Sequence, residues 1–293
     1  MTHKSGFVNI IGYPNVGKST LMNALVGEKL SIITNKAQTT RNRIMGIVSG
    51  EDFQIVYSDT PGIVRKPAYK MHEMMNNYIE MAFQDADILL LMTEPGLKFD
   101  EEWIIKKIKN TNASKIVLIN KIDLSSQDKI VEQINYWQDI IPQAEVIPIS
   151  AIKSFNIDKV FETIIDKLPE SPAYFPKNEL TDRSERFFAA EIIREKIFLN
   201  YKKEVPYSSE VIIDTYKESE NIININAFIY VERESQKGIL LGKQGSAMKK
   251  TGTMARLEME KFFEKKIFLQ ITVKVNKDWR NNENVLKRFG FDK

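Results

Sequence analysis

The sequence predicts an α/β domain with a doubly wound, mostly parallel sheet, followed by a smaller α+β domain. Three observations carry this prediction. Short apolar runs alternate with helical patterns through the first 170 residues, which is typical of a parallel sheet covered on both faces. Three prolines then fall close together, at Pro169, Pro172 and Pro176. Beyond these prolines the order of strands and helices changes.

In the first half, five apolar runs have the length and composition of buried strands. They are residues 7–11, 53–57, 88–92, 116–119 and 145–148. Helical patterns lie around residues 18–25, 70–84, 101–109, 126–140 and 157–168. A strand followed by a helix, repeated in this way, favours parallel pairing of the strands.

The second half has a different order of elements. Its pattern indicates a helix at 184–201, strands at 210–217 and 222–233, a helix at 246–265, a strand at 267–276 and a short helix at 283–289. In the strand at 222–233, apolar residues alternate with more polar ones, so one of its faces should be buried. We therefore expect a first domain over residues 1–170, a linker over 171–182 and a second domain over 183–293.

The composition excludes several classes of function. The chain of 293 residues is 43% hydrophobic and 28% charged, which is ordinary for a globular protein. The absence of cysteine excludes disulfides, thiolate metal sites and cysteine nucleophiles. No apolar run reaches the roughly 18 residues that a membrane span needs, and the N-terminus leads directly into a strand pattern. We therefore expect a soluble cytoplasmic protein without a secretory signal.

Charge is distributed unevenly along the chain. The net charge is +3 overall, but it is −2 over residues 1–170 and +5 over residues 171–293. Residues 237–288 alone carry 13 Lys and Arg against 5 Asp and Glu. Such a basic segment points to a polyanionic partner, although a solvated surface rich in lysine is the plainer alternative.

A phosphate-binding loop follows the first predicted strand. Residues Gly12–Ser19 match the pattern G-x-x-x-x-G-K-S between a strand and a helix, which is the context that the pattern requires. Its backbone N–H groups and the helix N-terminus favour phosphate. Lys18 should reach the β- and γ-phosphates and Ser19 should ligate Mg²⁺. The residues expected to contact nucleotide here are Gly12, Tyr13, Pro14, Asn15, Val16, Gly17, Lys18, Ser19 and Thr20.

Two further loops follow predicted strands and complete a nucleotide site. Asp59 should hold Mg²⁺ through water, and the N–H of Gly62 should sense the γ-phosphate. In the run Asn120–Asp123, Asp123 can accept from N1–H and the 2-amino group of guanine, which adenine lacks, so we expect GTP and not ATP. The other predicted contacts are Thr60, Pro61, Ile63, Asn120, Lys121, Ser150 and Ala151.

Together these motifs resemble the small GTP-binding proteins. That resemblance implies a threonine between residues 30 and 46 that completes the Mg²⁺ shell. Thr40 fits the family pattern T-T-R, with Thr39 as the alternative, so the expected metal set is Ser19, Thr40 and Asp59. Many relatives have a glutamine where this chain has Ile63, which implies a slow intrinsic rate.

The resemblance extends to a second cation. Asn15 is similar to a phosphate-loop asparagine that helps to hold K⁺ in related GTPases, so K⁺ is a candidate cofactor beside Mg²⁺. The expected catalytic set is Asn15, Lys18, Thr40, Asp59 and Gly62.

A second glycine loop lies in the basic half of the chain. The run Gly242–Gly245 is a G-x-x-G with a basic interior, which lets a sugar-phosphate backbone approach closely. The order helix-strand-strand-helix-helix-strand around it resembles a type II KH domain. The residues expected to contact RNA are Gly242, Lys243, Gln244, Gly245, Lys249 and Lys250.

A GTPase domain joined to a KH domain resembles the Era family of bacterial ribosome-assembly GTPases. This resemblance implies a GTP-hydrolysing switch that binds the 3′ end region of the small-subunit ribosomal RNA and assists maturation of the 30S subunit. It also implies peripheral contact with the inner membrane, and we expect a monomer. The alternatives are a membrane-associated signalling GTPase that docks through its basic C-terminal surface, with residues 246–265 as an amphipathic helix, and a degenerate GTPase domain that serves as a scaffold.

Overall fold

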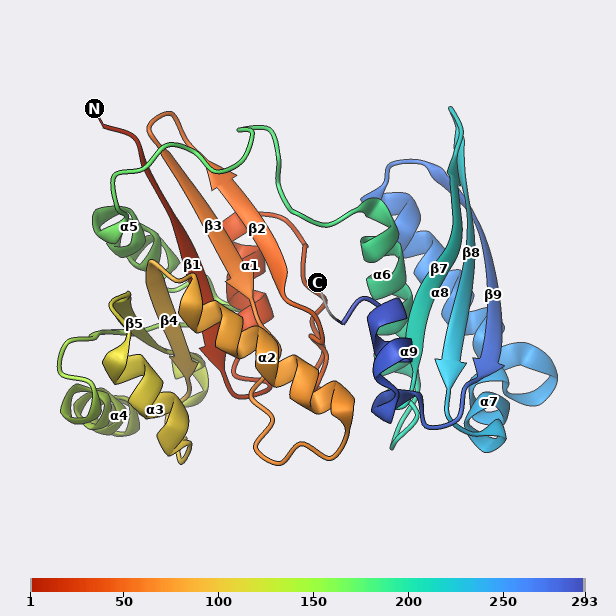
Figure 1. Ribbon diagram of the computed structural model, residues 1–293, viewed down its shortest axis with the longest axis horizontal. Coiled ribbons are helices and arrows are strands. Elements are labelled where there is room, and N and C mark those ends of the chain that lie inside the picture. Colours follow the sequence, from red (N-terminus) through yellow and green to blue (C-terminus); the bar gives the residue numbers. More distant parts are fainter. Residues whose placement is uncertain (1, 292–293) are drawn as a thin grey trace. The chain divides into compact units, whose positions relative to one another are not determined.

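The structure, a computed structural model, describes residues 2–291 and contains two compact units. The first unit holds the chain up to Pro67 together with Met75–Asp182, and the second holds Ala68–Met74 with the chain from Arg183 onward. Each unit has its own sheet (Figure 1).

The first unit is built on a six-stranded sheet with the order β2-β3-β1-β4-β5-β6. The strands are β1 (Lys4–Gly12), β2 (Ile44–Ser49), β3 (Phe53–Asp59), β4 (Ile88–Thr93), β5 (Ser114–Ile119) and β6 (Glu145–Pro148). All neighbours are parallel except β2, which is antiparallel to β3. The helices are α1 (Lys18–Val26), α2 (Lys70–Gln84), α3 (Glu102–Asn110), α4 (Gln127–Ile140) and α5 (Ile157–Lys167), and of α2 only the part from Met75 onward belongs to this unit. In Figure 1, α1 lies behind this sheet and α3 in front of it. The predicted doubly wound, mostly parallel sheet is thus confirmed.

The antiparallel strand β2 was not predicted from the sequence. Its apolar residues are interrupted by Gly46, which weakens the strand pattern. The structure explains the glycine: a Cβ atom at Gly46 would lie 2.7 Å from Val26 Cγ2 and 2.8 Å from Met22 Cε on α1. A glycine at this position of β2 therefore allows helix α1 to pack closely against the strand.

Residues 169–182, which include the expected linker, lie along the first unit. The N–H of Ser5 donates to the carbonyl of Pro169 over 3.1 Å, and the side-chain oxygen of Gln54 accepts from the N–H groups of Tyr174 and Phe175. Farther on, the N–H of Ile47 in β2 donates to the carbonyl of Leu180 over 2.8 Å, so this part of the segment lies beside β2. The segment is therefore held by backbone hydrogen bonds along its length.

The second unit has the element order of a type II KH domain. Its elements are α6 (Glu185–Asn200), β7 (Glu210–Glu218), β8 (Ile222–Val231), α7 (Glu234–Leu241), α8 (Ser246–Phe262), β9 (Lys266–Val275) and α9 (Glu283–Arg288). The strands form a sheet in which β8 pairs antiparallel with β7 and parallel with β9. Helix α7, which the resemblance implies but which no apolar period marked in the sequence, completes the order.

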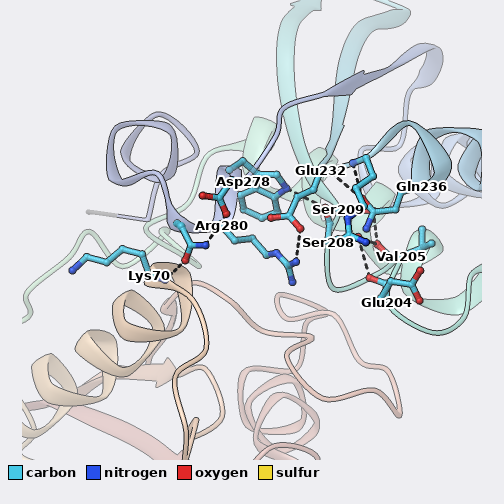
Figure 2. A network of polar contacts seen from close by, with 12 residues as sticks. Lys70, Glu204, Val205, Ser208, Ser209, Glu232, Gln236, Asp278 and Arg280 are labelled. Atoms are coloured by element: carbon cyan, nitrogen blue, oxygen red, sulfur yellow. Dashed lines mark hydrogen bonds and ion pairs between the residues drawn. The ribbon is translucent and has the colours of Figure 1, made fainter.

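The core of this unit lies between one face of the sheet and the helices α6, α7 and α8. Alternate residues of β8, from Ile223 to Val231, are buried there together with Ile193, Met248 and Met259. At one end of the unit, Trp279 Nε1 donates to the carbonyl of Ser208 over 3.1 Å. Figure 2 shows the neighbouring ion pair between Arg280 and Glu232.

Candidate nucleotide and RNA sites

The phosphate loop leaves the carboxyl end of β1 and enters α1, where the backbone must turn sharply. Gly17 has φ +103°, a conformation that L side chains rarely adopt. A Cβ atom at this position would also lie 2.3 Å from Asn120 Nδ2. Glycine is therefore required by both the backbone angle and the close approach of the Asn120 loop.

Lys18 is folded back over the phosphate loop. Its ammonium group donates to the carbonyls of Gly12 and Tyr13 over 3.1 and 2.9 Å, and the residue is only 6% exposed. Burial lowers the pKa of Lys18 to about 8, while the nearby Asp59 carboxylate acts in the opposite direction. The side chain is thus placed to exchange these carbonyls for phosphate oxygens.

Ser19, Thr40 and Asp59 form a cluster of oxygen atoms beside the loop. Ser19 Oγ lies 2.6 Å from Asp59 Oδ2 and 2.9 Å from Thr40 Oγ1. The Thr39 hydroxyl has other partners, because it donates to the carbonyl of Lys36 and contacts Thr34. Of the two threonines that the sequence left open, the geometry therefore favours Thr40.

The donor set of this cluster fits a hard cation such as Mg²⁺. Asp59 is fully buried, and its Oδ1 atom has no hydrogen-bond partner among the described residues. Burial raises the pKa of Asp59, because the ionised carboxylate is unfavourable away from water. A bound cation would stabilise that ionised form. Two hydroxyl oxygens and a buried carboxylate are ligands that Mg²⁺ accepts when phosphate and water supply the remainder.

The loop after Asp59 passes directly over the phosphate loop. Ile63 N donates to the carbonyl of Gly12 over 3.2 Å, and the Ile63 side chain is 2% exposed. A Cβ atom at Gly62 would lie 2.7 Å from the backbone of Pro14. At position 63 the structure thus places an apolar, buried side chain that cannot hydrogen-bond to water.

The loops after β5 and β6 meet at the base end of the site. Asn120 joins three segments, because its Nδ2 donates to the carbonyl of Val16 over 2.8 Å and its Oδ1 accepts from Ala151 N over 2.9 Å. The Ser150 hydroxyl donates to Asp123 Oδ1 over 2.6 Å. Asp123 is therefore held in a fixed orientation at the mouth of the site, as selective recognition of a base requires.

These loops enclose a cavity of about 460 Å³, a size that suits a nucleotide. Eleven of the predicted nucleotide residues line it: Pro14, Asn15, Gly17, Lys18, Ser19, Thr20, Thr40, Gly62, Asn120, Lys121 and Asp123. The other predicted contacts are Gly12, Tyr13, Val16, Asp59, Thr60, Pro61, Ile63, Ser150 and Ala151, which are not among its lining residues.

Sequence reasoning missed several residues that line the cavity. Leu124 and Ile152 are 79% and 76% exposed and lie at the base end, next to the predicted base loops. Ile33 and Asn35 line it on the other side, and Asn35 accepts a hydrogen bond from the Asn15 side chain. The signal for Leu124 and Ile152 was an apolar residue directly after each polar base-loop motif.

The G-x-x-G loop joins α7 to α8 in the second unit. Gly242 and Gly245 have φ +70° and +77°, and Gln244 also has a positive φ, so the loop turns tightly before α8. A Cβ atom at Gly242 would lie 2.6 Å from Ala247 Cβ. The predicted contacts Lys243, Gln244, Lys249 and Lys250 are all exposed. The loop therefore presents a bare backbone beside basic side chains.

The fold and these two sites define a class: a P-loop GTPase domain followed by a KH domain. The family model described as a 50S ribosome-binding GTPase matches residues 7–121, and the KH domain model matches residues 204–280. The GTPase Era of Syntrophus aciditrophicus is 47% identical over 99% of this chain and 95% of its own, and that of Ruminiclostridium cellulolyticum is 43% identical over 99% and 98%. The chain belongs to the Era family of GTPases.

Solved structures agree with this assignment. A crystal structure of Era in complex with MgGDPNP and nucleotides 1506–1542 of 16S ribosomal RNA has a TM-score of 0.94, with 37% identity over 99% of both chains. An Aquifex aeolicus Era variant bound to GDP and AlF4⁻ has the same TM-score, with 38% identity over 98% and 99%. Within residues 2–291, no helix has the length and apolar character needed to cross a membrane.

Proposed function

We propose that this protein is a GTP-hydrolysing switch that binds the 3′ end region of small-subunit ribosomal RNA and assists maturation of the 30S subunit. The observation that supports the proposal is that one cavity is lined by Lys18, by the Ser19–Thr40 hydroxyl pair and by Asp123. Phosphate, cation and base recognition thus share one site. The relative solved with MgGDPNP and 16S ribosomal RNA supports both ligands.

The chain's own residues divide the work. Lys18 leaves the carbonyls of Gly12 and Tyr13 and binds the β- and γ-phosphates. Ser19, Thr40 and Asp59 hold Mg²⁺, which neutralises phosphate charge when it is bound. The N–H of Gly62 donates to the γ-phosphate. Since Thr40 and Gly62 belong to different loops, loss of the γ-phosphate releases both loops.

Hydrolysis should be slow without a further group, because Ile63 cannot orient the attacking water. K⁺ held by Asn15 is our candidate for added charge stabilisation. If so, replacing K⁺ with Na⁺ lowers kcat in the wild type but not in Asn15→Ala. An equal rate in both salts would contradict the potassium role.

In the C-terminal domain, RNA binds at the Gly242–Gly245 loop and at Lys249 and Lys250. We place the GTPase domain at 1–170 and the KH domain at 183–293, with 171–182 as the connecting segment. A monomeric state, a cytoplasmic location and peripheral contact with the inner membrane stay predictions.

The function is tested by GTP hydrolysis with and without an oligonucleotide of the ribosomal RNA 3′ end. We expect RNA to change the rate in the wild type, and Lys18→Ala to abolish turnover. A triple variant Lys243→Ala, Lys249→Ala, Lys250→Ala should lose the RNA response while it keeps basal turnover. The matched control removes three exposed lysines of the GTPase domain, Lys106, Lys109 and Lys153. Equal loss of RNA response in both triple variants would contradict a specific site.

A further variant, Leu257→Ala, distinguishes the membrane alternative from RNA binding. The α8 residues Met248 and Met259 are buried in the core, whereas Met254, Leu257 and Phe262 are exposed. A docking helix would bind anionic vesicles, and Leu257→Ala would weaken that binding. If the protein binds RNA through its glycine loop, we expect Leu257→Ala to leave its RNA affinity unchanged.

A further inference from the structure

The KH sheet has a second face that the helices α6, α7 and α8 do not cover. Along β8 it carries Asn224, Asn226, Phe228 and Tyr230, which alternate with the buried core residues. On the neighbouring strand β9, Phe268 and Gln270 pair with Asn224 and Asn226 and so lie on the same face, whereas Ile271 packs against the core. We call this surface the open sheet face.

Strand register places an exposed aromatic ring among side-chain amides. Phe268 pairs with Asn224, and Gln270 pairs with Asn226, across β9 and β8. Phe268 is 56% exposed. Asn224 and Asn226 are partly exposed and Gln270 is exposed. One ring is therefore flanked by three groups that can each donate and accept hydrogen bonds.

The charged side chains of the open sheet face are mainly basic. Lys217 pairs with Asn224 on the β7 side, while Lys266 and Lys274 lie at the two ends of β9 on the same face. Of the acidic residues, Glu210 is only 6% exposed, and Asp214 lies in the β-bulge at the margin. The exposed part of the face thus attracts polyanions.

One end of the open sheet face is already occupied by the chain itself. The ring of Tyr230 packs on Phe289, with 4.9 Å between centroids, and Lys274 Nζ lies 3.2 Å from the centroid of Phe228. These aromatic residues have structural partners. Within the part of the chain that the structure describes, the Phe268 ring contacts no other aromatic ring. The free end is therefore the region around Phe268.

We propose that the open sheet face is a second RNA surface, on which a single-stranded base stacks on Phe268 and its neighbours bond to the amides. This inference rests on the RNA binding proposed above but uses a different face from the G-x-x-G loop. Stacking on a protruding ring, amide contacts to base edges and lysines near the backbone are the features by which proteins bind single strands. A protein partner is the less favoured occupant, because amides and lysines surround only one apolar group.

The test compares two RNA lengths on the full-length protein. An oligonucleotide of about 5 nucleotides fills the glycine-loop groove alone, and one of about 25 nucleotides reaches both surfaces. We expect Phe268→Ala to weaken binding of the long RNA about tenfold and to leave the short RNA unchanged. The triple lysine variant of the glycine loop should weaken both. The matched control is Leu257→Ala, because Leu257 is an apolar residue of α8 that is 47% exposed.

Direct contact is checked by photocrosslinking from a benzophenone amino acid at position 268, which should label the long RNA. Equal affinity of Phe268→Ala and Leu257→Ala for the long RNA, with no crosslink, would overturn the proposal. A change in sedimentation of Phe268→Ala with unchanged RNA affinity would also overturn it, since the face would then bind a second copy of the chain. If the wild type binds neither RNA, the proposed function itself fails.

Discussion

Arg43 and Asp85 join the end of the loop that contains Thr40, just before β2, to the residue that follows helix α2. The guanidinium group donates from two nitrogens to the two carboxylate oxygens, over 2.7 and 3.0 Å. It also donates to the Ser58 hydroxyl over 2.6 Å and to Asn9 Oδ1 over 3.1 Å. Arg43 is 4% exposed. These contacts hold the ends of both segments together.

Asp85→Ala should destabilise the protein, because it leaves a buried guanidinium group without its carboxylate. The Asp85 side chain is 39% exposed, so solvent screens part of the loss. We expect the free energy of unfolding to fall by about 2 kcal/mol. Urea denaturation followed by circular dichroism measures this change.

The control for that experiment is Glu283→Ala, which breaks the exposed pair between Glu283 and Lys287. An exposed pair of this kind contributes about 0.5 kcal/mol or less. Similar midpoints for the two variants would show that the Arg43–Asp85 pair does not fix the two segments.

Gly17→Ala should damage the nucleotide site, whereas Gly27→Ala should not. Both glycines have positive φ, but a Cβ atom at Gly27 meets nothing within 4 Å. Strain alone costs about 1 kcal/mol at Gly27. At Gly17 the new methyl group also displaces Asn120 from Val16, so affinity for GDP should fall about 100-fold. Fluorescence titration with a labelled GDP measures both variants, and equal affinities would contradict the Asn120 argument.

The nucleotide site could be predicted from sequence because its residues follow strands that are parallel and adjacent. Gly12–Ser19, Asp59 and Asn120 each come at the carboxyl end of a buried strand, so the sheet brings them together. Each motif also has a local pattern that chemistry constrains. The α/β order followed from the alternation of apolar runs, whereas the KH order, which includes α7, came from the resemblance to that domain.

Other features depend on contacts between segments that are distant in sequence. The role of Gly46 in β2 is visible only once α1 packs against it. The choice between Thr39 and Thr40 depends on which hydroxyl faces Asp59, and the T-T-R pattern favoured Thr40 by resemblance alone. Likewise, the exposure of Phe268 depends on strand register, because the same alternation could equally have buried it.

Asp123→Asn should change the base that the protein prefers. The amide can donate to the 2-oxo group of xanthine but cannot accept two N–H groups as the carboxylate does. We expect affinity for GTP to fall about 100-fold and affinity for xanthosine triphosphate to rise. Isothermal titration calorimetry with both nucleotides measures the switch.

Two further variants serve as controls for that result, Ser150→Ala for the orientation of Asp123 and Asp128→Asn for the loss of charge. Ser150→Ala removes the 2.6 Å hydrogen bond that orients Asp123 and should weaken GTP binding about tenfold without changing base preference. Asp128 lies five residues after Asp123 in α4 and is exposed, so Asp128→Asn removes the same charge without effect. An unchanged preference in Asp123→Asn would refute guanine recognition by this carboxylate.

GDP binding should take up a proton near pH 8.5. Burial lowers the pKa of Lys18 to about 8, so above that pH the free protein holds a neutral amine. Phosphate favours the ammonium form and raises the pKa again, so binding is accompanied by protonation and affinity falls as the pH rises above about 8. Without nucleotide the effect of pH on folding has the opposite sign. The unfolded chain holds this proton more tightly, so the contribution of Lys18 to stability increases as the pH rises from about 8 to its ordinary pKa.

Calorimetry in buffers of different ionisation enthalpy measures the number of protons taken up on GDP binding, and Lys18→Met, which cannot titrate, should show none. A proton count that is the same in the wild type and in Lys18→Met would assign the uptake to another group.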